Sequence, residues 1–175
     1  VVWLLPANSK FFDVDGCLKK YDEIYWTQNY KIQKGDIVYI YSSSPDSCIK
    51  YKLIVEAHDV TYHTDFDKEK EFYVDVNDFE TAKEHNRFIK LRLLSESHTH
   101  KMSLPHLLEN GLSMAPRGGM NLSNASAARL LKYIEENLKN RIYSTSIKIM
   151  PEVKIPGLST LIGQAAAEKT DSGII

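Results

Sequence analysis

Apolar and polar residues alternate along several stretches of the chain, as they do in strands that expose one face to water. Every second residue from Ile49 to Ala57 is apolar, and the residues between them are mostly charged. Residues 37–42 are apolar or aromatic at all but the last position, which is typical of a strand covered on both faces. Only a short serine-rich loop separates these two stretches, so we predict that they form a hairpin. Residues 1–5, followed by a proline that should end the strand, and residues 87–95 are predicted as further strands.

Helix signals lie between these strands. Asp13 or Asp15 is placed to cap a short helix, because a carboxylate there accepts a hydrogen bond from a first-turn N–H. Residues 103–111 begin with a serine, carry a proline near the first turn and end in a glycine, which is a compact helix signature. The longest helix is predicted over residues 124–138, where apolar side chains recur at helical spacing. Residues 64–71 are predicted to be a charged, solvated loop.

The alternation of strands with short helices favours an α+β fold with a strongly curved sheet or open barrel. With 175 residues, 43% of them hydrophobic, the chain is long enough for one domain that buries its own core. After residue 142 the composition loosens, and prolines and small residues become frequent. We therefore expect one domain over residues 1–142 and a C-terminal extension over residues 143–175.

The charge balance excludes a strong global field. Lysine and arginine number 22 against 23 acidic residues, so the formal net charge is -1, and a nucleic-acid partner would have to meet a local basic face. The two cysteines do not suggest a disulfide framework. The apolar opening of the chain is too short for a signal-peptide core or a membrane span. We expect a cytoplasmic protein with reduced thiols and no membrane partner.

The sequence lacks the familiar catalytic and cofactor motifs. His98, His100 and His106 lie close together, but no cysteine or carboxylate completes a known metal-ligand pattern with them. There is no nucleophile elbow, no dinucleotide-binding glycine pattern and no phosphate-binding loop. We therefore expect no catalytic residue, no metal and no cofactor, and the pattern favours binding over turnover.

Residues 23–44 concentrate aromatic side chains beside hydroxyl groups and lysines. The large aromatics are Tyr25, Trp26, Tyr30, Tyr39 and Tyr41. One explanation is a strand whose aromatics fill the core, because aromatic residues are favoured in strands. The other is a pocket for a planar ligand, since a nucleobase stacks on tryptophan or tyrosine with ~1–3 kcal/mol. The pattern is compatible with both.

Four segments, in order along the chain, carry a family likeness. They are WLLPANSKFFDVDGCLKKYDEIYW at 3–26, GDIVYIYSS at 35–43, IKYKLIVEAHDV at 49–60 and GLSMAPRGGMNLS at 111–123. Together they resemble the EVE domains of the PUA-like superfamily, which are relatives of the YTH readers of methylated adenine. The resemblance implies a curved, mostly antiparallel β-barrel flanked by short helices. It also implies a non-catalytic module that binds DNA or RNA carrying a modified base and accepts that base, flipped, in an aromatic pocket.

The resemblance assigns pocket roles to three residues, Trp26, Asn8 and Thr27. Trp26 matches the first wall of the aromatic cage, although a tryptophan near a barrel mouth is also typical of a core. Asn8 matches an asparagine that bonds the base edge, and its amide both donates and accepts; the alternative is an ordinary turn asparagine. Thr27 would face the modified exocyclic group of the base.

The remaining pocket residues are assigned less directly. Tyr30 and Tyr41 are candidates for the other cage walls. Ser42 and Ser43 follow the strand of Tyr41 and would line the opposite side of the pocket. A polar loop after a strand explains these two serines equally well.

Phosphate contacts are expected from Arg117, Lys10 and Lys34. Arg117 precedes a predicted helix start, whose positive dipole end favours a phosphate, but a surface-loop arginine has the same context. Lys10 and Lys34 would belong to a local basic face, and solvated surface lysines are the usual alternative.

Two other functions are compatible with the pattern. The related ASCH type includes small hydrolases acting on nucleosides or RNA, which use a lysine with a nearby threonine and glutamate. No spacing in this chain singles out such a trio. A protein-interaction domain with an unused pocket would instead expose an apolar patch on the last helix or the C-terminal extension.

Overall fold

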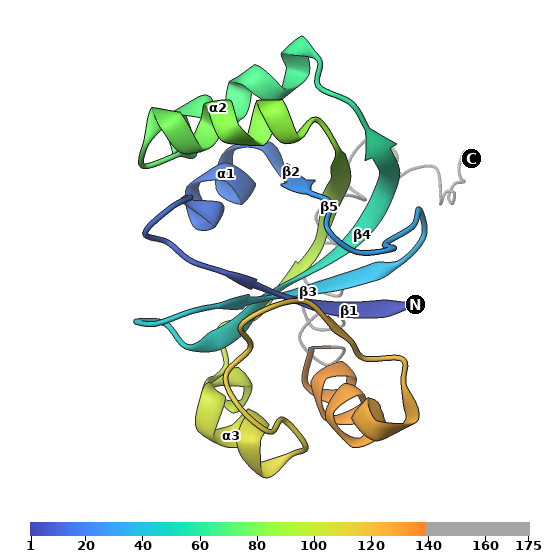
Figure 1. Ribbon diagram of the computed structural model, residues 1–175. Coiled ribbons are helices and arrows are strands. Elements are labelled where there is room, and N and C mark those ends of the chain that lie inside the picture. The colour runs from blue at the N-terminus through green and yellow to red at the C-terminus, as the bar shows by residue number, and fades with distance from the viewer. Residues whose placement is uncertain (139–175) are drawn as a thin grey trace, which may run out of the picture. The chain divides into compact units, whose positions relative to one another are not determined.

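The computed structural model describes residues 1–138, which fold around one curved sheet of six strands (Figure 1). The strands are β1 (Val2–Ala7), β2 (Glu23–Thr27), β3 (Ile37–Ser42), β4 (Cys48–Val60), β5 (Phe88–Glu96) and β6 (Met120–Asn121). The α-helices are α1 (Val14–Tyr21), α2 (Val76–His85) and α3 (Leu104–Glu109), and a further helix occupies residues 128–138. Three segments are 3-10 helices: η1 (Thr64–Phe72), η2 (His100–Met102) and η3 (Ala125–Ala127).

The strand order is β2-β5-β4-β3-β1-β6. β1 pairs with β3 in parallel, and the other four pairs are antiparallel. The expected α+β class and the mostly antiparallel sheet are therefore confirmed. Within residues 1–138 no pairing joins the edge strands β2 and β6, so the sheet is open and not a closed barrel.

The central strands are buried on both faces, because helices cover both sides of the sheet (Figure 1). Val38 and Ile40 of β3 face the core that includes α1, whereas Tyr39 and Tyr41 face the core that includes α3 and the helix over 128–138. Tyr39 and Tyr41 are 0% and 2% exposed. These two aromatics of the 23–44 stretch are thus core residues, and the continuous apolar run of β3 is explained.

Local signals in the sequence predicted several elements well. β3 and β4 form the predicted hairpin, and the alternating stretch from Ile49 to Ala57 lies within β4 as expected. Asp13, and not Asp15, caps α1 and accepts a hydrogen bond from the Gly16 N–H at 3.0 Å. The predicted helix over 103–111 is α3, and Gly111 follows it with a φ of 113°, a conformation that favours glycine.

Two local predictions were wrong for reasons of tertiary structure. Pro6 does not end β1 but lies inside it. Strand β6 pairs with β1 only at Trp3 and Leu4, so it accepts no hydrogen bond from position 6. The missing N–H of the proline therefore breaks no pairing on that edge. Residues 64–71 are not a loop but part of the 3-10 helix η1. Most of them are exposed, as expected of a charged segment, but Phe66 and Glu69 are buried.

The predicted boundary between residues 142 and 143, and the C-terminal extension, lie outside the described residues. Among residues 1–138, none of the helices has the length and apolar content that crossing a bilayer requires. The same residues contain no group of three or more histidine, cysteine, aspartate or glutamate side chains arranged to hold a metal ion.

Candidate functional site

Among the described strands, β1 and β2 do not pair with each other, and we call the region between them the open seam of the sheet. It contains a cavity of about 290 Å³, which we call the Trp26 cavity. It lies between the end of β1, the turn that follows, and β2, strands that are far apart in the sheet order. Its aromatic walls are Phe11, Phe12, Tyr25, Trp26 and Tyr73. The curvature of the sheet thus brings the two sides of the seam close enough to share one cavity.

The Trp26 cavity is electrically neutral. None of the described residues that line it is acidic or basic, and its polar groups come from Asn8, Thr27 and tyrosine hydroxyls. Burial raises the pKa of Tyr73 above its ordinary value, and burial with a hydrogen bond to Asp65 does the same for Tyr25. No lining group can therefore act as a general base near neutral pH. The cavity suits a neutral, planar ligand.

Asn8 holds the turn at the mouth of this cavity. Its Oδ1 accepts a hydrogen bond from the Lys10 N–H at 2.9 Å, and its backbone oxygen accepts from the Phe11 and Phe12 N–H groups at 3.0 and 3.3 Å. Within residues 1–138 its Nδ2 has no acceptor. The asparagine therefore combines the expected turn role with an amide donor directed to no other described residue.

A smaller cavity of about 220 Å³ adjoins the first, and we call it the Arg117 cavity. Pro6, Trp26 and Thr27 line both cavities. Tyr30 and Arg117 line only the smaller one, and among residues 1–138 Arg117 is the one charged residue in its lining. The two compartments thus differ in charge although they share a wall.

Strand β2 is held at the seam by a buried carboxyl group. The Tyr25 N–H donates to Glu69 Oε2 at 2.8 Å, and Glu69, a residue of η1, is fully buried. Burial raises the pKa of Glu69 to about 8, outweighing the hydrogen bond from Tyr25 and the nearby Lys68 ammonium. The edge strand that carries Trp26 therefore has a backbone donor satisfied by a group that stays protonated at neutral pH.

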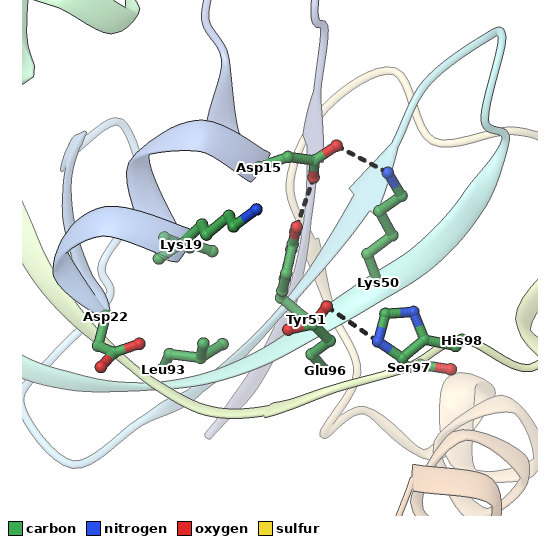
Figure 2. A pocket seen from close by; sticks show the side chains of 10 residues that line it. Asp15, Lys19, Asp22, Lys50, Tyr51, Leu93, Glu96, Ser97 and His98 are labelled. Carbon is green, nitrogen blue, oxygen red and sulfur yellow. Dashed lines mark hydrogen bonds and ion pairs between the residues drawn. The ribbon is translucent and has the colours of Figure 1, made fainter.

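A separate cavity of about 560 Å³ lies beside α1, between that helix and strands β4 and β5 (Figure 2). In it Asp15 accepts hydrogen bonds from the Tyr51 hydroxyl and from Lys50 Nζ, the latter at 2.9 Å. Burial alone would raise the pKa of Asp15, but these two partners outweigh it and hold the pKa below its usual value. Asp15 is therefore an ionised partner of Lys50 and not a general acid.

Some of the other charges of the α1 cavity are paired. Lys50 bonds Asp46 at 2.6 Å as well as Asp15, and His98 Nε2 lies 2.9 Å from Glu96 Oε2 (Figure 2). Lys19 and Asp22 also line the cavity, and their side chains form no ion pair or hydrogen bond with another described residue. No threonine is among the described residues that line the cavity, so its composition does not match the lysine, threonine and glutamate set expected for an ASCH-like hydrolase.

Comparison with known proteins supports the fold. No family model matches the chain, and no curated protein matches it. A hypothetical protein from Leishmania major is similar in structure, with 22% identity, a TM-score of 0.50, and coverage of 77% of this chain and 94% of that chain. A mutant ASCH protein from Zymomonas mobilis is similar with 12% identity, a TM-score of 0.50, and coverage of 75% and 94%. The chain shares the fold of these two proteins. Similarity at these identities concerns the fold alone.

On this fold, Asn8, Trp26 and Thr27 come together in one cavity. Tyr30 and Arg117, which the resemblance assigned to the pocket and to phosphate, lie next door in the Arg117 cavity. The structure therefore brings five of the predicted site residues to two adjoining cavities at one seam of the sheet.

The other predicted residues lie elsewhere. Tyr41 is sealed in the core on the far face of β3, where no cavity at the seam reaches it. Ser42 and Ser43 line neither seam cavity but a small one of about 20 Å³, which shares Ala7, Phe12 and Val14 with the Trp26 cavity. Lys10 lies in the Asn8 turn, whereas Lys34 lies in the turn before β3, with its N–H bonded to His58, and lines neither seam cavity.

Sequence reasoning missed several aromatic walls. Phe11 and Phe12 directly follow the Asn8 turn, so a pair of phenylalanines beside a site asparagine was an available signal. Tyr73 had no such signal. It reaches the seam because Phe12 and Tyr73 form an isolated antiparallel bridge, with ring centroids 4.7 Å apart.

Proposed function

We propose that this protein is a non-catalytic, EVE-like reader that binds a nucleic acid and holds a flipped, modified base in the Trp26 cavity. One observation carries the proposal: a neutral, aromatic cavity at the open seam, with the Asn8 amide and the Thr27 hydroxyl at its edge. Flipping a base costs a few kcal/mol. Stacking on Trp26 with ~1–3 kcal/mol, together with edge hydrogen bonds, offsets that cost.

Selectivity for a modified base would follow from the apolar lining. Each methylene or methyl carbon buried against the aromatic walls contributes ~0.8 kcal/mol. The amide of Asn8 can distinguish base edges by donating and accepting, because its side chain is not fully used by the turn. A charged ligand is disfavoured, since none of the lining residues in the described part of the chain offers a counter-charge inside the Trp26 cavity.

The experiment is a binding panel measured by fluorescence anisotropy. Labelled single-stranded and duplex oligonucleotides carry one N6-methyladenine, 5-methylcytosine, 5-hydroxymethylcytosine or the unmodified base. We expect tighter binding to at least one modified base and a loss of roughly 5- to 150-fold in Trp26→Ala, the equivalent of one stacked base. Leu108→Ala, which removes an exposed apolar side chain on α3, is the matched control. Equal binding of all probes by Trp26→Ala and wild type would refute the proposal.

The alternative, an ASCH-like hydrolase, would use the α1 cavity, because that cavity holds a lysine beside ionisable groups. Its test is hydrolysis of acylated nucleosides and of RNA by the same preparations. Turnover that survives Trp26→Ala but is lost in Lys50→Gln would favour the enzyme over the reader. No turnover with either substrate class would leave the reader as the better-supported function.

A further inference from the structure

Trp26 is shared by two compartments. Together with Pro6 and Thr27 it lines both the Trp26 cavity of about 290 Å³ and the Arg117 cavity of about 220 Å³. Each volume is at or below the lower end of the ~300–1,000 Å³ that drug-sized ligands occupy. Each compartment therefore has room for one planar ring system, with Trp26 in the wall that they share.

The Arg117 cavity has the chemistry of a nucleotide site. The Tyr30 ring supplies a flat surface that remains 39% exposed, and Asn29 supplies an amide. Arg117 is exposed, and it forms no ion pair with any residue of the described part of the chain. A guanidinium without a carboxylate partner is suited to a phosphate.

The glycines of this compartment keep it open. A Cβ at Gly119 would lie 2.6 Å from Tyr30 Cε2 and 3.0 Å from Leu5 Cδ2, and one at Gly118 would lie 3.1 Å from the Tyr30 hydroxyl. The Gly119 N–H donates to that hydroxyl at 2.8 Å. The backbone must therefore approach the tyrosine closely, and any larger residue at Gly119 would displace the Tyr30 ring that lines the cavity.

We infer that the ligand occupies the seam as two consecutive nucleotides of a single strand. One base lies in the Trp26 cavity, the neighbouring base lies on Tyr30 in the Arg117 cavity, and Arg117 binds the phosphate that joins them. A single strand is favoured because extruding two neighbours from a duplex would pay the unstacking cost twice. This inference rests on the proposed reader function and adds the ligand's strandedness and its minimal length.

The test compares ligands that differ by one nucleotide. Isothermal titration uses the 5′-monophosphates of N6-methyladenosine, 5-methylcytidine, 5-hydroxymethylcytidine and their parents, and the same nucleotides extended by one uridine on the 5′ or the 3′ side. For the best-bound base, we expect one of the two extensions to improve affinity roughly 5- to 150-fold. Arg117→Gln should reduce this gain and lower the salt dependence by about one phosphate contact. Lys132→Gln, on the helix over residues 128–138, should leave both unchanged.

Gly119→Ala is the second variant, and it should remove the gain from the added uridine while leaving the monophosphate affinity intact. If Gly119→Ala does not fold, Arg117→Gln still tests whether the added uridine binds in the Arg117 cavity. The inference would be overturned if the monophosphate and both dinucleotides bound with equal affinity. If Trp26→Ala still weakened the binding of all three, the proposed reader function would stand. Equal weakening of monophosphates and dinucleotides by Gly119→Ala would show that one ligand fills both compartments, which also overturns it. No binding by any member of the panel would overturn the reader function itself.

Discussion

Glu69 should make the folded protein less stable as the pH rises. Its carboxyl is fully buried, Oε2 accepts one hydrogen bond from Tyr25, and within the described residues Oε1 has no partner. Burial raises the pKa of Glu69 from its ordinary 4.5 to about 8, and the carboxylates of Asp65 and Glu23 add to the effect against the opposing charge of Lys68. The group therefore titrates at different pH values in the folded and unfolded chain.

The sign and size follow from proton linkage. Between pH 4.5 and about 8 the unfolded chain has released the Glu69 proton while the folded chain keeps it. Folded protein then binds more protons, so the free energy of unfolding falls by about 1.4 kcal/mol per pH unit. The stabilisation is complete below pH 4.5 and is lost as the pH approaches 8. From pH 5 to pH 7 the loss is on the order of 3 kcal/mol, or roughly 10 °C in Tm.

Glu69→Gln isolates this effect, because an amide oxygen can still accept from Tyr25 but does not titrate. Urea denaturation at pH 5, 6 and 7 should show the variant gaining on wild type by about 3 kcal/mol across the range. Glu71→Gln is the control, since Glu71 is exposed and paired with Lys20. Wild-type and Glu69→Gln stabilities that change in parallel with pH would refute the reasoning.

Three further predictions test the turn, the α1 cavity and a glycine. Asn8→Ala should weaken binding of the preferred oligonucleotide roughly 2- to 10-fold without changing its salt dependence, because one edge hydrogen bond is lost and no phosphate contact; unchanged affinity would leave Asn8 as a turn residue only. Tyr51→Phe should cost about 1 kcal/mol in urea denaturation, since Asp15 loses a buried donor, and a loss of oligonucleotide binding would move the ligand to the α1 cavity. Gly111→Ala should lower Tm more than Gly35→Ala: both residues have positive φ (113° and 93°), but only at Gly111 would a Cβ meet backbone, the Leu130 nitrogen at 3.1 Å. Equal losses would contradict the packing argument.

The pocket itself was only partly accessible to sequence reasoning. Trp26 and Asn8 could be singled out because the family likeness places them, and the structure puts both at one seam. The sequence favoured Tyr41 as a pocket residue as well, because it is an aromatic in the same stretch as Trp26. In the structure Tyr41 is buried on the face of β3 that packs against α3, away from the Trp26 cavity. Alternation along a strand separates two faces, but it does not say which face an open cavity will occupy.

Local order was determined by the sequence itself. The alternation from Cys48 onward, the Asp13 cap of α1 and the glycine after α3 are short-range signals, because strand pleat, helix capping and positive φ depend on neighbours a few residues apart. Only tertiary structure decided that η1 would bury Glu69 and that β1 and β2 would face each other across a cavity. Those outcomes depend on the curvature of the sheet and on the segments that pack against it. Contacts between residues distant in the chain, such as Phe12 with Tyr73, determine the curvature and the packing.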